Sequence, residues 1–269
     1  MTNPQPQPAV FIPHGGGPCF FMDWSWGPPD TWHATQRFLE GLAATLPAPP
    51  KALLVISGHW EEPAFTASAA PAPRLIFDYS GFPEHTYRLT WPAPGNPQLA
   101  MRVADMLRQA GLPSAIDATR GFDHGVFVPL KVVFPNAEIP VVTLSLAASL
   151  DPALHLAAGR ALVPLRDEGV LIVGSGMSFH NLRAYMRPET GERARTFDDW
   201  LTRAVESPAD ERTALLAEWR KAPFAAFAHP REEHLIPLLV AAGAGSHAPG
   251  KRVFIDEPMG ARISAYRFD

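Results

Sequence analysis

GVLIVGSGMSFHN, residues 169–181, is the stretch that indicates the fold of this chain. Its residues 170–173 form a continuous apolar run without alternation, which is typical of a strand covered on both faces of a parallel sheet. His180 follows this run after a short turn. The stretch therefore predicts a buried strand that ends beside a side chain able to bind a metal or to move a proton.

Two earlier stretches repeat this pattern. Residues 9–12 are apolar and lead into His14, which is followed by three glycines, and residues 52–56 are apolar and lead into His59. In open α/β sheets the ligand crevice lies outside the carboxyl ends of the strands. We therefore expect His14, His59 and His180 to converge at one edge of the sheet.

The whole chain, residues 1–269, is expected to form one α/β domain, because 46% of its residues are hydrophobic and no linker divides it. Residues 1–8 are polar and rich in proline, so we expect them to be mobile. Apolar periodicity predicts helices over 31–46, 97–110, 152–168, 192–207, 210–221 and 232–242. Further strands are predicted at 51–57, 139–146 and, once or twice, within 251–268. The 30 prolines predict long, ordered, proline-rich loops, above all the aromatic segment 61–97.

The composition excludes several partners. A net charge of −4 and a pI near 6.2 provide no basic field for nucleic acid or an anionic membrane. A single cysteine fits a reducing compartment, and no apolar run reaches the length of about 18 residues that a membrane helix needs. The amino terminus does not resemble a signal peptide, so we expect a cytoplasmic protein.

Histidine is the residue type that points to chemistry. The chain has ten histidines and no CxxC motif, so a metal site must combine His with Asp or Glu. Their contexts favour five of them as site residues: His14, His59, His124, His180 and His234. No two of these five histidines have the spacing of a helical zinc motif. Each of the five could also be an ordinary loop histidine bonded to the backbone. The other five, His33, His85, His155, His229 and His247, are interpreted as surface or packing residues.

Two features of the sequence are compatible with a hydrolase. The His-Gly-Gly-Gly sequence at 14–17 is similar to an esterase oxyanion loop, but neither candidate around Ser175 and Ser178 completes the GxSxG motif that such an enzyme needs. A metal-dependent hydrolase stays open, because the same histidines could activate a metal-bound water.

Seven segments, in this order, resemble the class III extradiol ring-cleaving dioxygenases, specifically the single-chain DOPA 4,5-dioxygenase type. They are PHGG at 13–16, SGHW at 57–60, DYSGFP at 78–83, Tyr87 with WPAPG at 91–95, GFDHG at 121–125, SGMSFHNL at 175–182, and Glu233-His234 with Pro237-Leu238. The resemblance implies a three-layer α/β/α domain and a non-haem Fe(II) site, with zinc in the resting site of some members. It also implies a catechol-type aromatic diol and O2 as substrates, a muconic semialdehyde-type product, and allows a homo-oligomer.

The resemblance also assigns roles to residues. His14 and His59 become metal ligands, with His234 as the third ligand and Glu233 as its alternate. His180 becomes the acid/base, and His124 holds a substrate hydroxyl or the bound oxygen. Phe82, Tyr87 and Trp60 are expected to contact the substrate. The first loop departs from the family's pattern: it has three glycines and Pro-Cys-Phe-Phe at 18–21, where the DOPA type reads more like GSPM. The resemblance therefore does not fix which catechol is the substrate. Two other functions stay open: a metal-dependent hydrolase, and a non-catalytic metal-binding relative that acts as an interaction protein.

Overall fold

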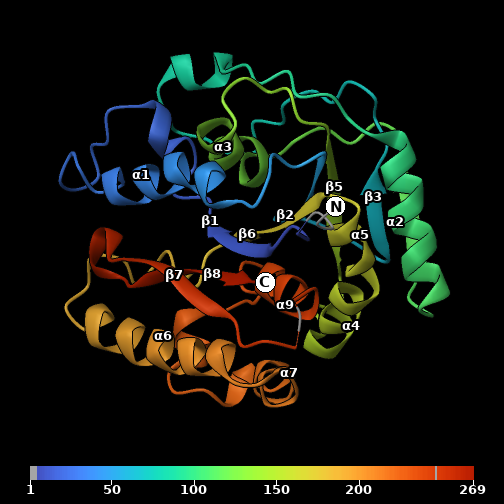
Figure 1. Cartoon of the computed structure of the whole chain (residues 1–269). Helices are drawn as coiled ribbons and strands as arrows, with labels where there is room; N and C mark the ends of the chain where they lie inside the picture. Colours follow the sequence, from blue (N-terminus) through green and yellow to red (C-terminus); the bar gives the residue numbers. More distant parts are fainter. Residues whose placement is uncertain (1–4, 246) are drawn as a thin grey trace.

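The computed structural model describes residues 5–245 and 247–269 of the chain. In these residues one eight-stranded sheet has helices on both faces (Figure 1). The strands are β1 (Ala9–Pro13), β2 (Ala52–Glu62), β3 (Phe65–Ser68), β4 (Ser114–Asp117), β5 (Val141–Ala147), β6 (Val170–Gly176), β7 (Lys251–Asp256) and β8 (Ile263–Phe268). The helices are α1 (His33–Leu42), α2 (Pro97–Gln109), α3 (His124–Val133), α4 (Pro152–Leu162), α5 (Pro164–Asp167), α6 (Thr190–Glu206), α7 (Ala209–Ala217), α8 (Ala225–Ala228) and α9 (Ile236–Gly243).

The sheet has the order β4-β3-β5-β2-β6-β1-β8-β7. Its central strands β5, β2, β6 and β1 are parallel, whereas β8 runs antiparallel to β1 and β7 antiparallel to β8. Every residue of β1 and β6 is buried, as the continuous apolar runs predict. The three-layer α/β/α fold with a mostly parallel sheet is confirmed.

Helices cover both faces of the central strands. On one face α3 packs against β2 and β6 and also contacts α1, while on the other α9 contacts β1, β2 and β6 and packs against α4 (Figure 1). The helices α6 and α7 pack against each other, and α6 also contacts β7 and β8. In the part of the chain that the structure describes, no helix combines the length and the apolar character needed to cross a membrane.

Capping residues explain where two of the predicted helices begin. The Asn96 side chain accepts a hydrogen bond from the backbone N–H of Leu99 at 3.0 Å, and Asp151 does the same for Leu154 at 3.1 Å. Each cap is followed at once by proline, whose missing N–H costs nothing in the first turn of a helix. The start of α2 and of α4 therefore matches the sequence prediction.

Several predicted elements differ from the structure. The helix predicted over 152–168 is broken after Leu162, because Pro164 lacks the N–H that would continue the ladder and starts the short α5 instead. The segment 61–97 contains β3, and three elements were not predicted: β4, α8 and the helix α3, which begins at His124. The last predicted helix begins at Ile236 rather than at 232, where a hydrogen-bonded turn precedes it.

The predicted mobility of residues 1–8 does not hold at Gln7. Its side chain donates to the carbonyl of Ala48 at 2.9 Å, and its own carbonyl accepts from the Arg166 guanidinium at 2.6 Å. Gln7 is buried, because these bonds fix the chain just before β1. Residues 1–4 lie outside the described residues.

Candidate metal centre and catalytic cavity

The carboxyl ends of β1 and β6 and the last part of β2 meet at one edge of the sheet, as the sequence predicts. His14 directly follows β1, His59 lies in β2 where its register shifts between Ile56 and Glu61, and His180 follows β6. His234 comes from the turn before α9, which packs against these strands. The sheet edge therefore collects histidines that are up to 220 positions apart in the chain.

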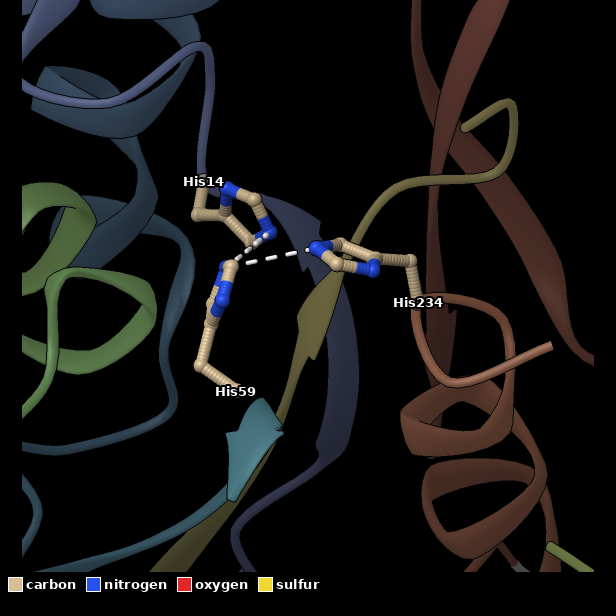
Figure 2. Close-up of side chains that lie close together, drawn as sticks. All are labelled: His14, His59 and His234. Atoms are coloured by element: carbon tan, nitrogen blue, oxygen red, sulfur yellow. Dashed lines mark hydrogen bonds between the residues drawn. The ribbon is translucent and has the colours of Figure 1, made fainter. Parts of the chain in front are cut away.

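Three imidazole rings point toward one another at this edge (Figure 2). The Nε2 atom of His59 lies 3.3 Å from Nε2 of His14 and 3.2 Å from Nε2 of His234. These three residues form one of three groups of side chains close enough to share a metal ion among the described residues. The other two groups, His59-Asp78-His124 and His180-Glu233-His234, each overlap the first by one histidine.

The outer nitrogen of each ring faces an acceptor. Nδ1 of His14 lies 2.9 Å from the carbonyl oxygen of Gly15, and Nδ1 of His234 lies 2.9 Å from Oε1 of Glu233. Nδ1 of His59 lies 3.7 Å from Oδ2 of Asp78. Because a carbonyl and a carboxylate only accept, Nδ1 carries the proton in His14 and His234, and their Nε2 lone pairs face the centre of the cluster. This donor set fits a cation that binds imidazole.

The electrostatics keep these rings neutral. Burial, followed by the nearby histidines, lowers the pKa of His14 and of His59 well below the usual 6.5. Burial lowers the pKa of His234 to about 4, although the hydrogen bond to Glu233 opposes this shift. Neutral imidazole is the form that binds a metal, so the three rings are ready to bind a metal at pH 7 without losing a proton.

Asp78 connects a ligand of this cluster to His124. Its Oδ1 accepts from the backbone N–H of His124 at 2.9 Å and from Nδ1 of the same ring at 2.8 Å, while its Oδ2 faces His59. Burial alone would raise the pKa of the Asp78 carboxyl. The two hydrogen bonds from His124 outweigh this effect, so the pKa of Asp78 lies below its ordinary value. A negative charge therefore fixes the orientation of His124 and faces His59.

Glu233 makes the corresponding connection on the other side. Its Oε1 faces Nδ1 of His234 at 2.9 Å and Nδ1 of His180 at 3.6 Å, and the His180 ring stacks on His234 with centroids 3.4 Å apart. Arg231 binds Glu61 with two hydrogen bonds and lies 3.3 Å from Oε2 of Glu233. Burial alone would raise the pKa of the Glu233 carboxyl. Hydrogen bonds from His180 and His234 outweigh this effect, so the pKa of Glu233 lies well below its usual range. The carboxylate faces Nδ1 of His234 and not the three Nε2 atoms.

Glycines allow His234 to approach the sheet. A Cβ atom on Gly176 would lie 2.2 Å from the carbonyl oxygen of His234, and one on Gly174 would lie 2.3 Å from that of Pro237. The His234 carbonyl also accepts from the backbone N–H of Met177 at 3.0 Å. The Gly-Ser-Gly sequence at 174–176 therefore serves close backbone packing and not an esterase elbow.

A cavity of about 520 Å³ lies above the histidines. His14, His59, His124, His180 and His234 all line it, so the structure brings together the five histidines singled out by their sequence context. Phe82 also lines it, with Tyr79 from the same segment. Three tryptophans, Trp24, Trp26 and Trp32, form much of the remaining wall together with Met177, Leu182, Tyr185, Met186, Met259 and the glycines at 15–17.

The other two predicted substrate contacts are not on this wall. Trp60 follows His59 in the strand and points to the opposite side, where its Nε1 donates to Glu62 and the Arg120 guanidinium covers its ring at 4.9 Å. Tyr87 packs behind Tyr79, with its hydroxyl 3.4 Å from the backbone N–H of Phe82. The sequence prediction missed the three tryptophans, although their density between residues 24 and 32 was a visible signal.

The five remaining histidines lie outside the cavity wall. His155 is buried, accepts from the backbone N–H of Ala147 and contacts the carbonyl of Asp151, while His229 is buried against the carbonyl of Ser178. His85 bonds to the carbonyl of Phe21 at the surface, and His33 and His247 are exposed. They are packing or surface residues, as interpreted from the sequence.

Comparison with known proteins gives the family. The family model described as the catalytic LigB subunit of aromatic ring-opening dioxygenase matches residues 8–265. The dioxygenase tasH of Hapsidospora irregularis is 39% identical over 96% of this chain and 84% of its own. The 4,5-DOPA dioxygenase extradiol of Beta vulgaris is 40% identical over 78% of this chain and 79% of its own.

A solved structure agrees with this result. The crystal structure of uncharacterized protein JW3007 from Escherichia coli K12 matches with a TM-score of 0.79 and 28% identity, covering 98% of this chain and 100% of that chain. The family match spans nearly all of the chain, including the sheet edge that carries the histidine cluster. The chain therefore belongs to the LigB family of extradiol, aromatic ring-opening dioxygenases, and it is a metal-dependent ring-cleaving oxidoreductase.

Proposed function

We propose that the chain opens the ring of a catechol-type diol beside its two hydroxyl groups, with O2, at one non-haem Fe(II) ion held by His14, His59 and His234. The observation that carries this proposal is that the Nε2 atoms of His14 and His234 both lie within 3.3 Å of Nε2 of His59, at the floor of an aromatic cavity. Imidazole ligands suit iron and also zinc, so protein purified without added metal is expected to contain either.

Fe(II) bound there would lower the pKa of the catechol hydroxyls and bring the diol and O2 together. His180, beside this centre, would transfer the substrate's proton. Nδ1 of His180 faces the Glu233 carboxylate, which leaves its Nε2 free to take a hydroxyl proton from the substrate and to return it during ring opening. His180 is therefore assigned as the acid/base.

His124 is assigned a holding role on the opposite side of the cavity. Its Nδ1 donates to Asp78, so its Nε2 is an acceptor for a substrate hydroxyl. Its ring lies 3.9 Å from that of His59 and 5.4 Å from that of His14, measured between centroids. A diol bound near the cluster would lie between His124 and His180, and the aromatic wall would keep water away from the opened ring.

The experiment is reconstitution of the protein with Fe(II) under anaerobic conditions, followed by O2 and a panel of catechols. We expect O2 uptake and a coloured ring-opened product in equal amounts. His59→Ala should abolish turnover, whereas His33→Ala, an exposed histidine of α1, should leave it unchanged. A protein that opens no catechol with Fe(II) would refute the proposal, and hydrolysis with zinc in the absence of O2 would assign the site to a hydrolase.

A further inference from the structure

Apart from its histidines, the cavity is lined by uncharged side chains. Apart from the five histidines, the described residues that line it are glycine, tryptophan, tyrosine, phenylalanine, methionine and leucine. No lysine, arginine, aspartate or glutamate is among them. A carboxylate on the bound substrate would therefore lose its water without gaining a cation, which is strongly unfavourable.

The few polar atoms of the wall cannot replace a cation. The Tyr79 hydroxyl already donates to the carbonyl of Thr86 at 2.7 Å, and the Tyr185 hydroxyl to that of Phe179 at 3.2 Å. The indole N–H groups of Trp24 and Trp32 are buried and have no hydrogen-bond acceptor among the described residues. Because these neutral N–H groups are also buried from solvent, they cannot balance the negative charge of a bound carboxylate.

Three arginines near the cavity are paired with carboxylates. Arg231 is paired with Glu61 and Glu233, and Arg120 with Asp123 behind Trp60. An adjoining surface groove beyond Met186 holds arginines too, but Glu192 and Glu257 line the same groove and Arg195 is bound to Glu257. Arg231, Arg120 and Arg195 therefore offer no free positive charge to the cavity, and the exposed Arg183 and Arg187 do not line its wall.

The mouth of the cavity exposes apolar side chains. Leu182 is 72% exposed, Met186 66% and Trp26 49%, and all three line the cavity. Apolar side chains grouped at a site in this way are typical of ligand contacts. A volume of about 520 Å³ also leaves ample room beside a single catechol ring.

We infer that the substrate is a catechol whose ring substituent is uncharged and apolar, and that this substituent lies along the tryptophans and reaches Leu182 at the mouth. This inference depends on the proposed ring-opening function. It separates the chain from relatives whose names give carboxylate-bearing substrates: the 4,5-DOPA dioxygenase extradiol of Beta vulgaris, since DOPA is an amino acid, and the 2,3-dihydroxyphenylpropionate dioxygenase of Mycobacterium, which matches 31% of this chain at 39% identity.

A matched pair of substrates tests the inference: 3-(3,4-dihydroxyphenyl)propionate and its methyl ester, which differ in charge while sharing the same ring and chain. With the Fe(II)-loaded enzyme, we expect kcat/KM for the ester to exceed that for the acid by at least about 100-fold, and to exceed that for unsubstituted catechol. Quenching of tryptophan fluorescence in the protein as purified should show the same preference for the ester in binding, independently of turnover.

Leu182→Lys supplies the missing charge at the mouth and should lower the ester-to-acid ratio by about tenfold or more, while the uncharged Leu182→Gln should leave it nearly unchanged. Both substitutions fall on an exposed side chain, so the fold should tolerate them. Ring opening of both compounds with a ratio near one, or with the acid preferred, would overturn the inference and leave the proposed function intact. Failure to open any of the three compounds would count against the proposed function itself.

Discussion

Gly176→Ala is the substitution that most directly links the strand of the opening sequence to the metal centre. A Cβ atom at this position would lie 2.2 Å from the carbonyl oxygen of His234 and 3.1 Å from its carbonyl carbon. Real contacts of this kind are rarely shorter than 3.4 Å, so the backbone of His234 would have to retreat by roughly 1 Å. Overpacking of this kind typically costs about 1–3 kcal/mol of stability.

The functional loss should be larger than the loss of stability. His234 supplies one of the three converging Nε2 atoms, and its carbonyl is also anchored by the N–H of Met177. A displacement of about 1 Å in a catalytic group can cost about 100-fold in rate, and disturbed support of a ligand typically costs about 10- to 100-fold in metal affinity. We expect both losses in Gly176→Ala.

The assay compares the variant with Gly41→Ala, because Gly41 in α1 has no atom within 4 Å of the added Cβ. Zinc and Fe(II) affinities would be measured by competition with a chromophoric chelator, stability by urea unfolding, and kcat/KM by O2 uptake. The Gly41 variant should keep full activity and gain up to about 1 kcal/mol of stability. Wild-type metal affinity and turnover in Gly176→Ala would refute the reasoning.

Three further predictions concern single side chains. His180→Gln should lower kcat by about 100- to 10,000-fold while the metal content stays unchanged, because His180 stacks on the ligand cluster without joining its Nε2 atoms; loss of the metal would contradict its assignment. Glu233→Gln should weaken metal binding by about 10- to 100-fold, measured by chelator competition, because it removes the charged acceptor of His234. Burial lowers the pKa of His155 in the folded protein to about 4, below its value of about 6.5 in the unfolded chain. As the pH falls from about 6.5 to 4, this histidine binds a proton in the unfolded chain but not in the folded one, so up to about 3 kcal/mol of folding stability is lost in that window. Urea unfolding at pH 7 and pH 4 should show a smaller loss for His155→Gln, and an equal loss would exclude this role.

The sequence could predict the parts of the site that depend on strand ends. The uninterrupted apolar runs before His14 and His180 were enough to predict buried parallel strands, and parallel strands bring their carboxyl ends to one edge. Sequence context also singled out His234 and His124, which follow no predicted strand, and the resemblance in motif order then assigned their roles. The structure places all of these side chains on one cavity, while their individual roles stay predictions.

Other parts of the site depend on contacts that no local pattern encodes. Asp78 meets His124 across 46 positions, and β3 and β4 are only four residues long and pair with each other across the intervening α2. The tryptophan wall follows from how the loop before α1 folds over the sheet edge. The alternation of a strand argues against the predicted substrate contact of Trp60. Neighbouring residues in a strand point to opposite faces, and His59 already points into the site.

The central claim is that one divalent cation binds between His14, His59 and His234. The most direct measurement is an anomalous scattering map of protein crystals loaded with Fe(II) under anaerobic conditions and recorded at the iron edge. We predict a single peak within about 2.0–2.2 Å of all three Nε2 atoms. A peak bound instead to the carboxylates of Asp78 or Glu233, or none at the three nitrogens, would contradict the claim.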